Sequence, residues 1–213
     1  PSGQHELNKE YSEEIEFVSM NPQIELIGDG VILPSTNGLI FPFRSVNLTG
    51  VNVKVIRIYE DNVSQFFQSN NFDGRYSLTR VGRIIFKDDI KLKSDKKVDL
   101  GDWNTFSLDL SDMIKTEPGA IYRIMLSFKM SQSLYPCDCG DSSELERGIE
   151  YEDDMFEVNN RYWYSDENYN YGNSYYSYSE REDPCKIAYY SRSDNTVVKN
   201  VFASDFGIIV KGN

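Results

Sequence analysis

The chain has a single histidine, His5, which lies in a polar stretch near its amino terminus. Ser-His-Asp and Cys-His nucleophilic systems therefore lack the base that activates their nucleophile. A Gly-rich phosphate loop is also missing, because Gly28-Asp-Gly30 has neither a third glycine nor a following helix. We interpret these two glycines as a turn between strands. The sequence thus argues against hydrolases that use a serine or cysteine nucleophile activated by histidine, and it argues against nucleotide binding. We expect no enzymatic activity and no cofactor.

Long apolar runs and excess positive charge are absent as well. No window approaches the roughly 18 consecutive apolar residues of a membrane-spanning helix, so we expect no direct membrane insertion. The 213 residues include 34 acidic and 22 basic ones, for a net charge of −12, and no basic stripe is present. Nucleic acid is therefore not an expected partner. The first residues show neither an initiating Met nor a signal peptide, and we expect an excised fragment.

Most of the negative charge lies in one stretch of the chain. From Asp138 to Asp183, fourteen acidic residues stand against three arginines, and aliphatic residues are few. Such a composition cannot build an ordinary core. We therefore predict a disordered tail at 1–14 and a single domain at 15–213, interrupted by an acidic, tyrosine-rich insertion at 131–195. The domain is expected to fold when residues 135–189 are replaced by a short linker.

Alternation of apolar and polar residues indicates an all-β fold. Phe106 to Ser111 and Ile124 to Met130 alternate with period two, as expected for strands with one buried face. Further strands are predicted at 38–48, 51–59, 81–92 and 201–210, and another begins at Ile15. Only 62–68 and 143–156 are interpreted as helical. Seven strands separated by turn sequences favour a seven-stranded antiparallel β-sandwich, with a mixed α+β domain as the alternative.

Several of these segments together resemble a known family. They are residues 21–34 (NPQIELIGDGVILP), 39–48 with 51–67, 103–111 (WNTFSLDLS), 117–124 (EPGAIYRI) and 201–211 (VFASDFGIIVK). In this order they resemble an amino-terminal macroglobulin (MG) domain of bacterial alpha-2-macroglobulins. Asp183-Pro-Cys185 and the pair Tyr189-Tyr190 resemble relatives from the Bacteroidetes. The resemblance implies a macroglobulin or immunoglobulin-like sandwich.

The resemblance also implies a function for a longer parent protein. In this family a bait segment is cut, a thioester couples to the attacking protease, and a shell of MG domains closes around it. The Cys-x-Glu-Gln thioester signature does not occur in this sequence. The chain is therefore expected to be a non-catalytic structural domain of a protease-trapping inhibitor in the periplasm or cell envelope, anchored through its parent. Its implied partners are neighbouring MG domains and the trapped proteases.

Metal and carboxylate sites are weaker alternatives. A structural zinc site needs four soft ligands, whereas the chain offers three thiolates, from Cys137, Cys139 and Cys185. Only one residue separates Cys137 from Cys139, whereas two residues usually separate the cysteines of a zinc-binding pair. Residues 138–144 and 150–154 offer oxygen ligands but do not match the spacing of a calcium-binding EF-hand loop. A glycosidase would need two carboxyl groups fixed in a rigid cleft, whereas these acids lie in the least core-forming region. We assign no metal.

The envelope location that the resemblance implies is oxidising, so a disulfide is the preferred interpretation of the cysteines. Cys185 is expected to pair with Cys137 or Cys139, and the sequence does not choose between them. Either bridge would hold the two ends of the insertion together, and one thiol would remain free.

Aromatic side chains in the insertion form a possible interaction surface, because tyrosines beside Gly, Ser and Asn are typical of adaptable binding loops. The residues are Tyr162, Trp163, Tyr164, Tyr169, Tyr171, Tyr175 and Tyr176. Alternatively, the tyrosines pack over the outer face of the sandwich or belong to a disordered tract. If they bind a ligand, a second function becomes available, that of a stand-alone adhesin or a module that binds carbohydrate or protein.

Overall fold

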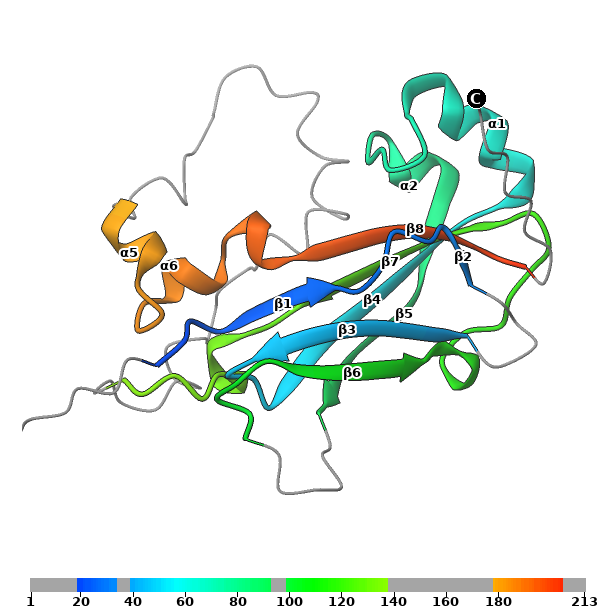
Figure 1. Ribbon diagram of the computed structural model, residues 1–213. Helices are drawn as coiled ribbons and strands as arrows, with labels where there is room; N and C mark the ends of the chain where they lie inside the picture. Colours follow the sequence, from blue (N-terminus) through cyan, green and yellow to red (C-terminus); the bar gives the residue numbers. More distant parts are fainter. Residues whose placement is uncertain (1–18, 34–38, 93–98, 138–177, 205–213) are drawn as a thin grey trace, which may run out of the picture.

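The structure is a computed structural model that describes residues 19–33, 39–92, 99–137 and 178–204, and the statements below concern these residues. The predicted tail at 1–14 and the strand beginning at Ile15 lie outside them. The described chain is mostly β, with two sheets and few helices (Figure 1). Its strands are β1 (Gln23–Leu26), β2 (Ile32–Leu33), β3 (Ile40–Val46), β4 (Gly50–Ile58), β5 (Gly82–Lys91), β6 (Asn104–Asp109), β7 (Ile121–Ser127) and β8 (Val197–Ala203).

Strand order differs from the predicted seven-stranded antiparallel sandwich in two respects. The described residues form eight strands, in a three-stranded sheet β1-β3-β6 and a five-stranded sheet β2-β8-β7-β4-β5. The second sheet is mixed, because β2 runs parallel to β8 whereas the other pairs are antiparallel. The prediction missed β1 and β2 because they are only four and two residues long. Such short segments give little periodic signal, and pairing with distant strands stabilises them.

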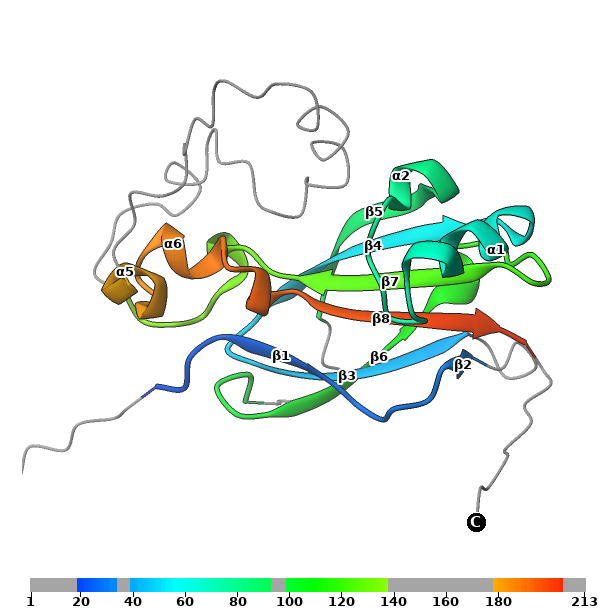
Figure 2. The ribbon, with the colours of Figure 1, turned by 90° about the horizontal axis from the view of Figure 1, so that it is seen from above.

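The main core lies between the two sheets. Phe41 and Phe43 of β3 point inward at alternate positions and join a cluster with Val53 of β4 and Ile124 of β7. Alternation in the sequence therefore identified the buried face of these strands correctly. Figure 2 shows the two sheets as layers, with β3 and β6 on one side and β4, β7 and β8 on the other.

Two helices cover one end of the outer face of the five-stranded sheet. They are α1 (Glu60–Ser69) and α2 (Leu78–Val81), which contribute Phe66 and Val81 to a second apolar cluster with Ile58 and Ile121. The predicted helix at 62–68 lies within α1 and is confirmed, whereas the predicted helix at 143–156 lies outside the described residues. Because both faces of β4 are covered, nearly all of its nine residues are buried.

The turn into β7 explains why its sequence has the form Pro-Gly-x-x-Tyr. Gly119 has a φ of +74°, a conformation that favours glycine. The backbone N–H of Glu117 donates a hydrogen bond of 2.6 Å to the hydroxyl oxygen of Tyr122, which ties the turn to the strand that follows it. Glu117 also pairs with Arg57 of β4 at 2.5 Å. This corner therefore fixes where β7 begins.

The chain between β7 and β8 packs more closely on the core than predicted. Its described elements are η2 (Met130–Gln132), α5 (Tyr178–Glu182), α6 (Ile187–Tyr190) and η5 (Ser193–Asn195). Tyr189 and Tyr190 are only 2% and 4% exposed and belong to the main core cluster. Replacing residues 135–189 by a short linker would therefore remove a buried core residue, Tyr189, and the expectation that the domain folds without this stretch stays a prediction. Aromatic rings supply the apolar area that aliphatic residues would otherwise provide.

Candidate functional site

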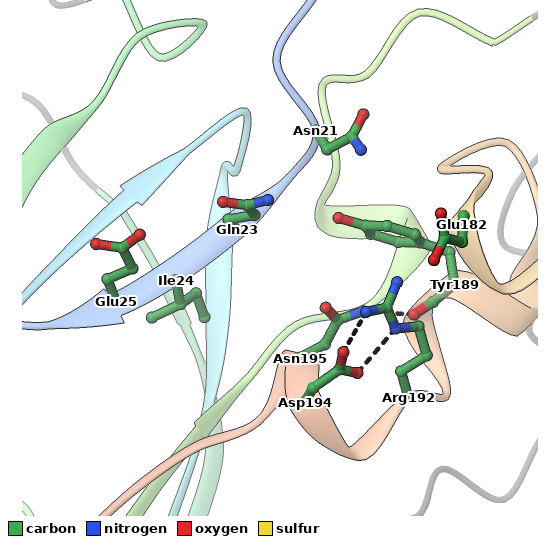
Figure 3. Close-up of a pocket in the computed structure, with 9 residues that line it drawn as sticks. All are labelled: Asn21, Gln23, Ile24, Glu25, Glu182, Tyr189, Arg192, Asp194 and Asn195. Atoms are coloured by element: carbon green, nitrogen blue, oxygen red, sulfur yellow. Dashed lines mark hydrogen bonds and ion pairs between the residues drawn. The ribbon is translucent and has the colours of Figure 1, made fainter.

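A polar cleft of about 330 Å³ separates β1 from the chain that leads into β8 (Figure 3). One wall comes from the first strand and the residues before it, and the other from α5, α6 and the turn around η5. The lining residues are Asn21, Gln23, Ile24, Glu25, Glu182, Tyr189, Arg192, Asp194 and Asn195. The cleft thus brings together residues that are more than 150 positions apart in the sequence.

An arginine–aspartate pair forms one side of the cleft. The Nε of Arg192 donates a 2.8 Å hydrogen bond to Oδ1 of Asp194, and its Nη2 contacts the other carboxylate oxygen. This bonding raises the pKa of Arg192 and lowers that of Asp194. The guanidinium also lies over the ring of Tyr189, 5.5 Å from its centroid. Arg192 is therefore held in place by its own chain.

Tyr189 connects the two walls. Its hydroxyl donates a 2.8 Å hydrogen bond to the carbonyl oxygen of Pro22, directly before β1. The side-chain amide of Asn195 donates in turn to the backbone carbonyl of Tyr189. Burial raises the pKa of the Tyr189 phenol to about 12, and the nearby Arg192 opposes that rise. The tyrosine is thus a neutral structural bridge at physiological pH.

Two carboxylates of the cleft are already paired with arginines of the same chain. The described part of the chain has no group of three or more His, Cys, Asp or Glu side chains placed to hold a metal ion. Asp194 is occupied by Arg192, and Glu25 is paired with Arg44 of β3. Arg44 also lies over the ring of Trp103, at 4.8 Å. The arrangement can therefore position chain segments and offer polar contacts to a partner.

A disulfide bond joins Cys137 to Cys185, with their Cα atoms 5.4 Å apart. The structure thus selects one of the two pairings that the sequence left open, and Cys139 lies outside the described residues. The backbone N–H of Cys185 donates to the side chain of Asp183, and the hydroxyl of Tyr190 donates to the carbonyl of Pro184. The bridge is consequently attached to the same core that contains Tyr190.

The predicted aromatic interaction surface falls within residues 138–177 and lies outside the described residues. Its members are Tyr162, Trp163, Tyr164, Tyr169, Tyr171, Tyr175 and Tyr176. The surface therefore stays a prediction. Among the described residues, no helix is long and apolar enough to cross a membrane.

Comparisons with known proteins found similarity in structure only. No protein-family model and no curated protein sequence matches the chain. Among solved structures, the chain is similar to native alpha-2-macroglobulin from Escherichia coli spanning domains MG0-NIE-MG1, with 15% identity, a TM-score of 0.39 and 51% of this chain covered. A structure of the same E. coli protein spanning domains NIE-MG1 gives 16% identity and a TM-score of 0.36 over 50% of this chain.

A third similar structure is a cryo-EM reconstruction of the native conformation of E. coli alpha-2-macroglobulin. The identity is 15%, the TM-score is 0.40, and 51% of this chain is covered. The chain spans about a third, a half and 7% of the lengths of these three structures.

Sequence reasoning missed the residues that form the cleft. Arg192 and Asp194 are two positions apart, and no periodic pattern marks them because η5 is a three-residue turn. Tyr189 stands out in the sequence only through the Tyr189-Tyr190 pair, which does not indicate a cleft. The available signal was the density of aromatic and apolar residues in Ile187-Ala-Tyr-Tyr190, which stands out from the acidic stretch before it.

Alkaline pH is expected to weaken the protein partly through Tyr189. Its folded-state pKa is raised to about 12, above the ordinary value of 10, so its contribution is fully present below pH 10. That contribution is lost as the pH rises from 10 through 12, because the unfolded state releases the proton more readily. We expect the stability difference between wild type and Tyr189→Phe, from urea unfolding, to shrink over this interval. A constant difference would contradict a buried, neutral phenol.

Proposed function

We propose that this chain is a non-catalytic macroglobulin domain of a bacterial alpha-2-macroglobulin-like protein that traps proteases in the cell envelope. The observation that carries the proposal is the corner at Glu117 to Tyr122. The Pro-Gly-x-x-Tyr motif, which resembles the family, forms a turn whose tyrosine hydroxyl accepts the Glu117 N–H and whose glycine has positive φ. The motif is thus part of the framework of the fold.

The order of the other resembling segments supports the proposal. Residues 21–34 contain β1 and β2, residues 39–67 contain β3, β4 and most of α1, and residues 103–111 contain β6. Each of these segments therefore contributes at least one strand to the two sheets. The finer resemblance to relatives from the Bacteroidetes is part of the same proposal.

A neighbouring domain of the parent chain would find a suitable surface on the outer face of the three-stranded sheet. Ile40 is 41% exposed there, and the exposed Arg44 pairs with Glu25 on the same face. Such a mixture of apolar and charged groups is typical of contacts between domains. In this view the domain contributes surface to a shell, and the proteases are partners of the whole shell.

The parent gene and the parent protein provide the test. The gene is expected to encode further domains of this kind. In the intact protein, trapping leaves a protease active on a small peptide but not on a large protein substrate. We expect Ile40→Asp to reduce the trapped fraction, whereas the control Phe67→Asp, on the exposed side of α1, leaves it unchanged.

A parent without further domains would overturn the proposed function as a whole. Equal trapping by the wild type and Ile40→Asp would overturn only the assignment of the interdomain face. The two failures are therefore distinguishable.

A further inference from the structure

Strand β1 lies at an edge of the three-stranded sheet and pairs with β3 alone. The N–H of Ile27, directly after β1, donates a 3.4 Å hydrogen bond to a carbonyl oxygen of β3. Because the backbone groups of successive residues in a strand point to opposite sides, those of Gln23 and Glu25 also face β3. The N–H and C=O groups of Ile24 and Leu26 therefore point away from β3.

These outward backbone groups are open in the part of the chain that the structure describes. There, no hydrogen bond joins a backbone group of Ile24 or Leu26 to a partner on the side away from β3. An edge strand with open backbone groups is a template for the addition of another strand. Addition also requires free space beside the edge.

The polar cleft provides that space. Its lining includes three consecutive residues of β1 (Gln23, Ile24 and Glu25) and none of β3, so the cleft lies on the open side of the strand. Figure 3 shows Asp194 and Asn195 on the other side of the cleft. The volume of about 330 Å³ falls within the roughly 300 to 1,000 Å³ that is usual for binding sites.

The charges of the cleft favour a basic occupant. Two of its carboxylates are neutralised, Glu25 by Arg44 and Asp194 by Arg192. Glu182 of α5 is exposed and close enough to Arg192 to raise the pKa of that arginine. Among the described residues, however, Glu182 has no hydrogen bond and no ion pair. A cationic side chain that entered the cleft would therefore be attracted to Glu182.

We propose that the cleft binds an extended peptide segment with a basic side chain, which adds to β1 as a further strand. Its backbone forms hydrogen bonds with the open groups of Ile24 and Leu26, and its basic side chain lies near Glu182. The backbone bonds supply affinity for many sequences, and the position of the basic residue supplies the preference.

The walls of the cleft are already fixed before a peptide enters. The hydrogen bond from Tyr189 to Pro22 connects them, and the pairing of Arg192 with Asp194 holds the turn at η5. A preformed site lowers the entropic cost of binding. The inference does not depend on the protease-trapping proposal, because it rests on the cleft and on the open edge of β1 alone.

Amide hydrogen exchange of the 15N-labelled full chain, measured by NMR, tests the placement. The probe is a capped seven-residue peptide of alternating threonine and valine with a lysine at its centre. We expect saturating peptide to slow exchange of the Ile24 and Leu26 N–H groups about tenfold, because they gain hydrogen bonds. The N–H of Glu25 faces β3 with or without peptide and is the internal control.

Three results would overturn the proposal. The first is slow exchange of Ile24 and Leu26 in the free protein, which would mean that another segment of this chain covers the edge, or a second copy if the protection grows with protein concentration. The second is a lack of binding at millimolar peptide. The third is binding that leaves both N–H groups unprotected.

The preference for a basic side chain has its own test. We expect Glu182→Gln to weaken binding of the lysine peptide about threefold, the effect of losing one exposed ion pair. Glu60→Gln, which removes an exposed carboxylate at the start of α1 and outside the cleft, is the matched control and should bind as the wild type does. Equal affinity of Glu182→Gln and the wild type would overturn the placement of the basic side chain.

Discussion

Replacing Tyr189 by alanine is expected to lower the free energy of unfolding by roughly 3 to 5 kcal/mol, the usual cost of deleting a large buried aromatic ring. The ring packs edge-on against Tyr190, with centroids 5.2 Å apart, and it belongs to the main core cluster. The substitution also removes the hydrogen bond to the carbonyl of Pro22. Urea unfolding, followed by the circular dichroism of the β-sheets, measures the change. We expect a lower midpoint concentration of urea, with an unchanged dependence of the unfolding free energy on urea concentration.

Two control variants separate the contributions of the ring and the hydroxyl. Tyr189→Phe keeps the ring and should cost about 1 kcal/mol, the typical value of one hydrogen bond. Tyr76→Ala truncates a tyrosine that is 68% exposed and should change stability by less than about 0.5 kcal/mol. If Tyr189→Ala behaved like Tyr76→Ala, the chain between β7 and β8 would not belong to the core.

Removal of the disulfide is the second change with a large expected effect. The bridge closes a loop with a sequence separation of 48, and in the chain-entropy model such a loop contributes about 4 kcal/mol. Cys185→Ser should therefore destabilise the protein by about that amount. Under denaturing, non-reducing conditions, the thiol titre should rise from one per chain to two.

Cys139→Ser is the matched control for this change. It removes the cysteine that is not part of the Cys137–Cys185 bridge, so stability should stay within about 0.5 kcal/mol of wild type. The titre should then fall to zero. A wild-type protein with three titratable thiols would contradict the bridge.

The longer strands were predictable because each encodes its own buried face. Phe106 and Leu108 of β6 alternate with polar residues, and the alternation of Val53 and Val55 in β4 gives the same signal. The two-residue strand β2 could not be predicted, since it exists only through parallel pairing with Phe202 and Ala203, about 170 positions away. The two residues of β2 do not indicate which distant strand they pair with.

The candidate site was less predictable than the strands for a related reason. Its walls come from segments that lie far apart in the sequence. Arg192 and Asp194 are residue types common on any protein surface, and only the folded chain places them beside β1. The choice of Cys137 over Cys139 is equally non-local. It depends on the contact between Tyr190 and Phe128, which packs the chain around Cys185 against the core near Cys137.

The hydrogen bond from Tyr189 to Pro22 also has a consequence for biosynthesis. The two residues are separated by 167 positions, so the ribosome completes β1 long before its partner leaves the exit tunnel. At ordinary rates of translation this interval lasts roughly ten to thirty seconds. β1 is an edge strand of the three-stranded sheet, and it can pair with β3 long before the contact between Tyr189 and Pro22 forms. The contact that holds the start of β1 against the core is therefore one of the last that a growing chain can make.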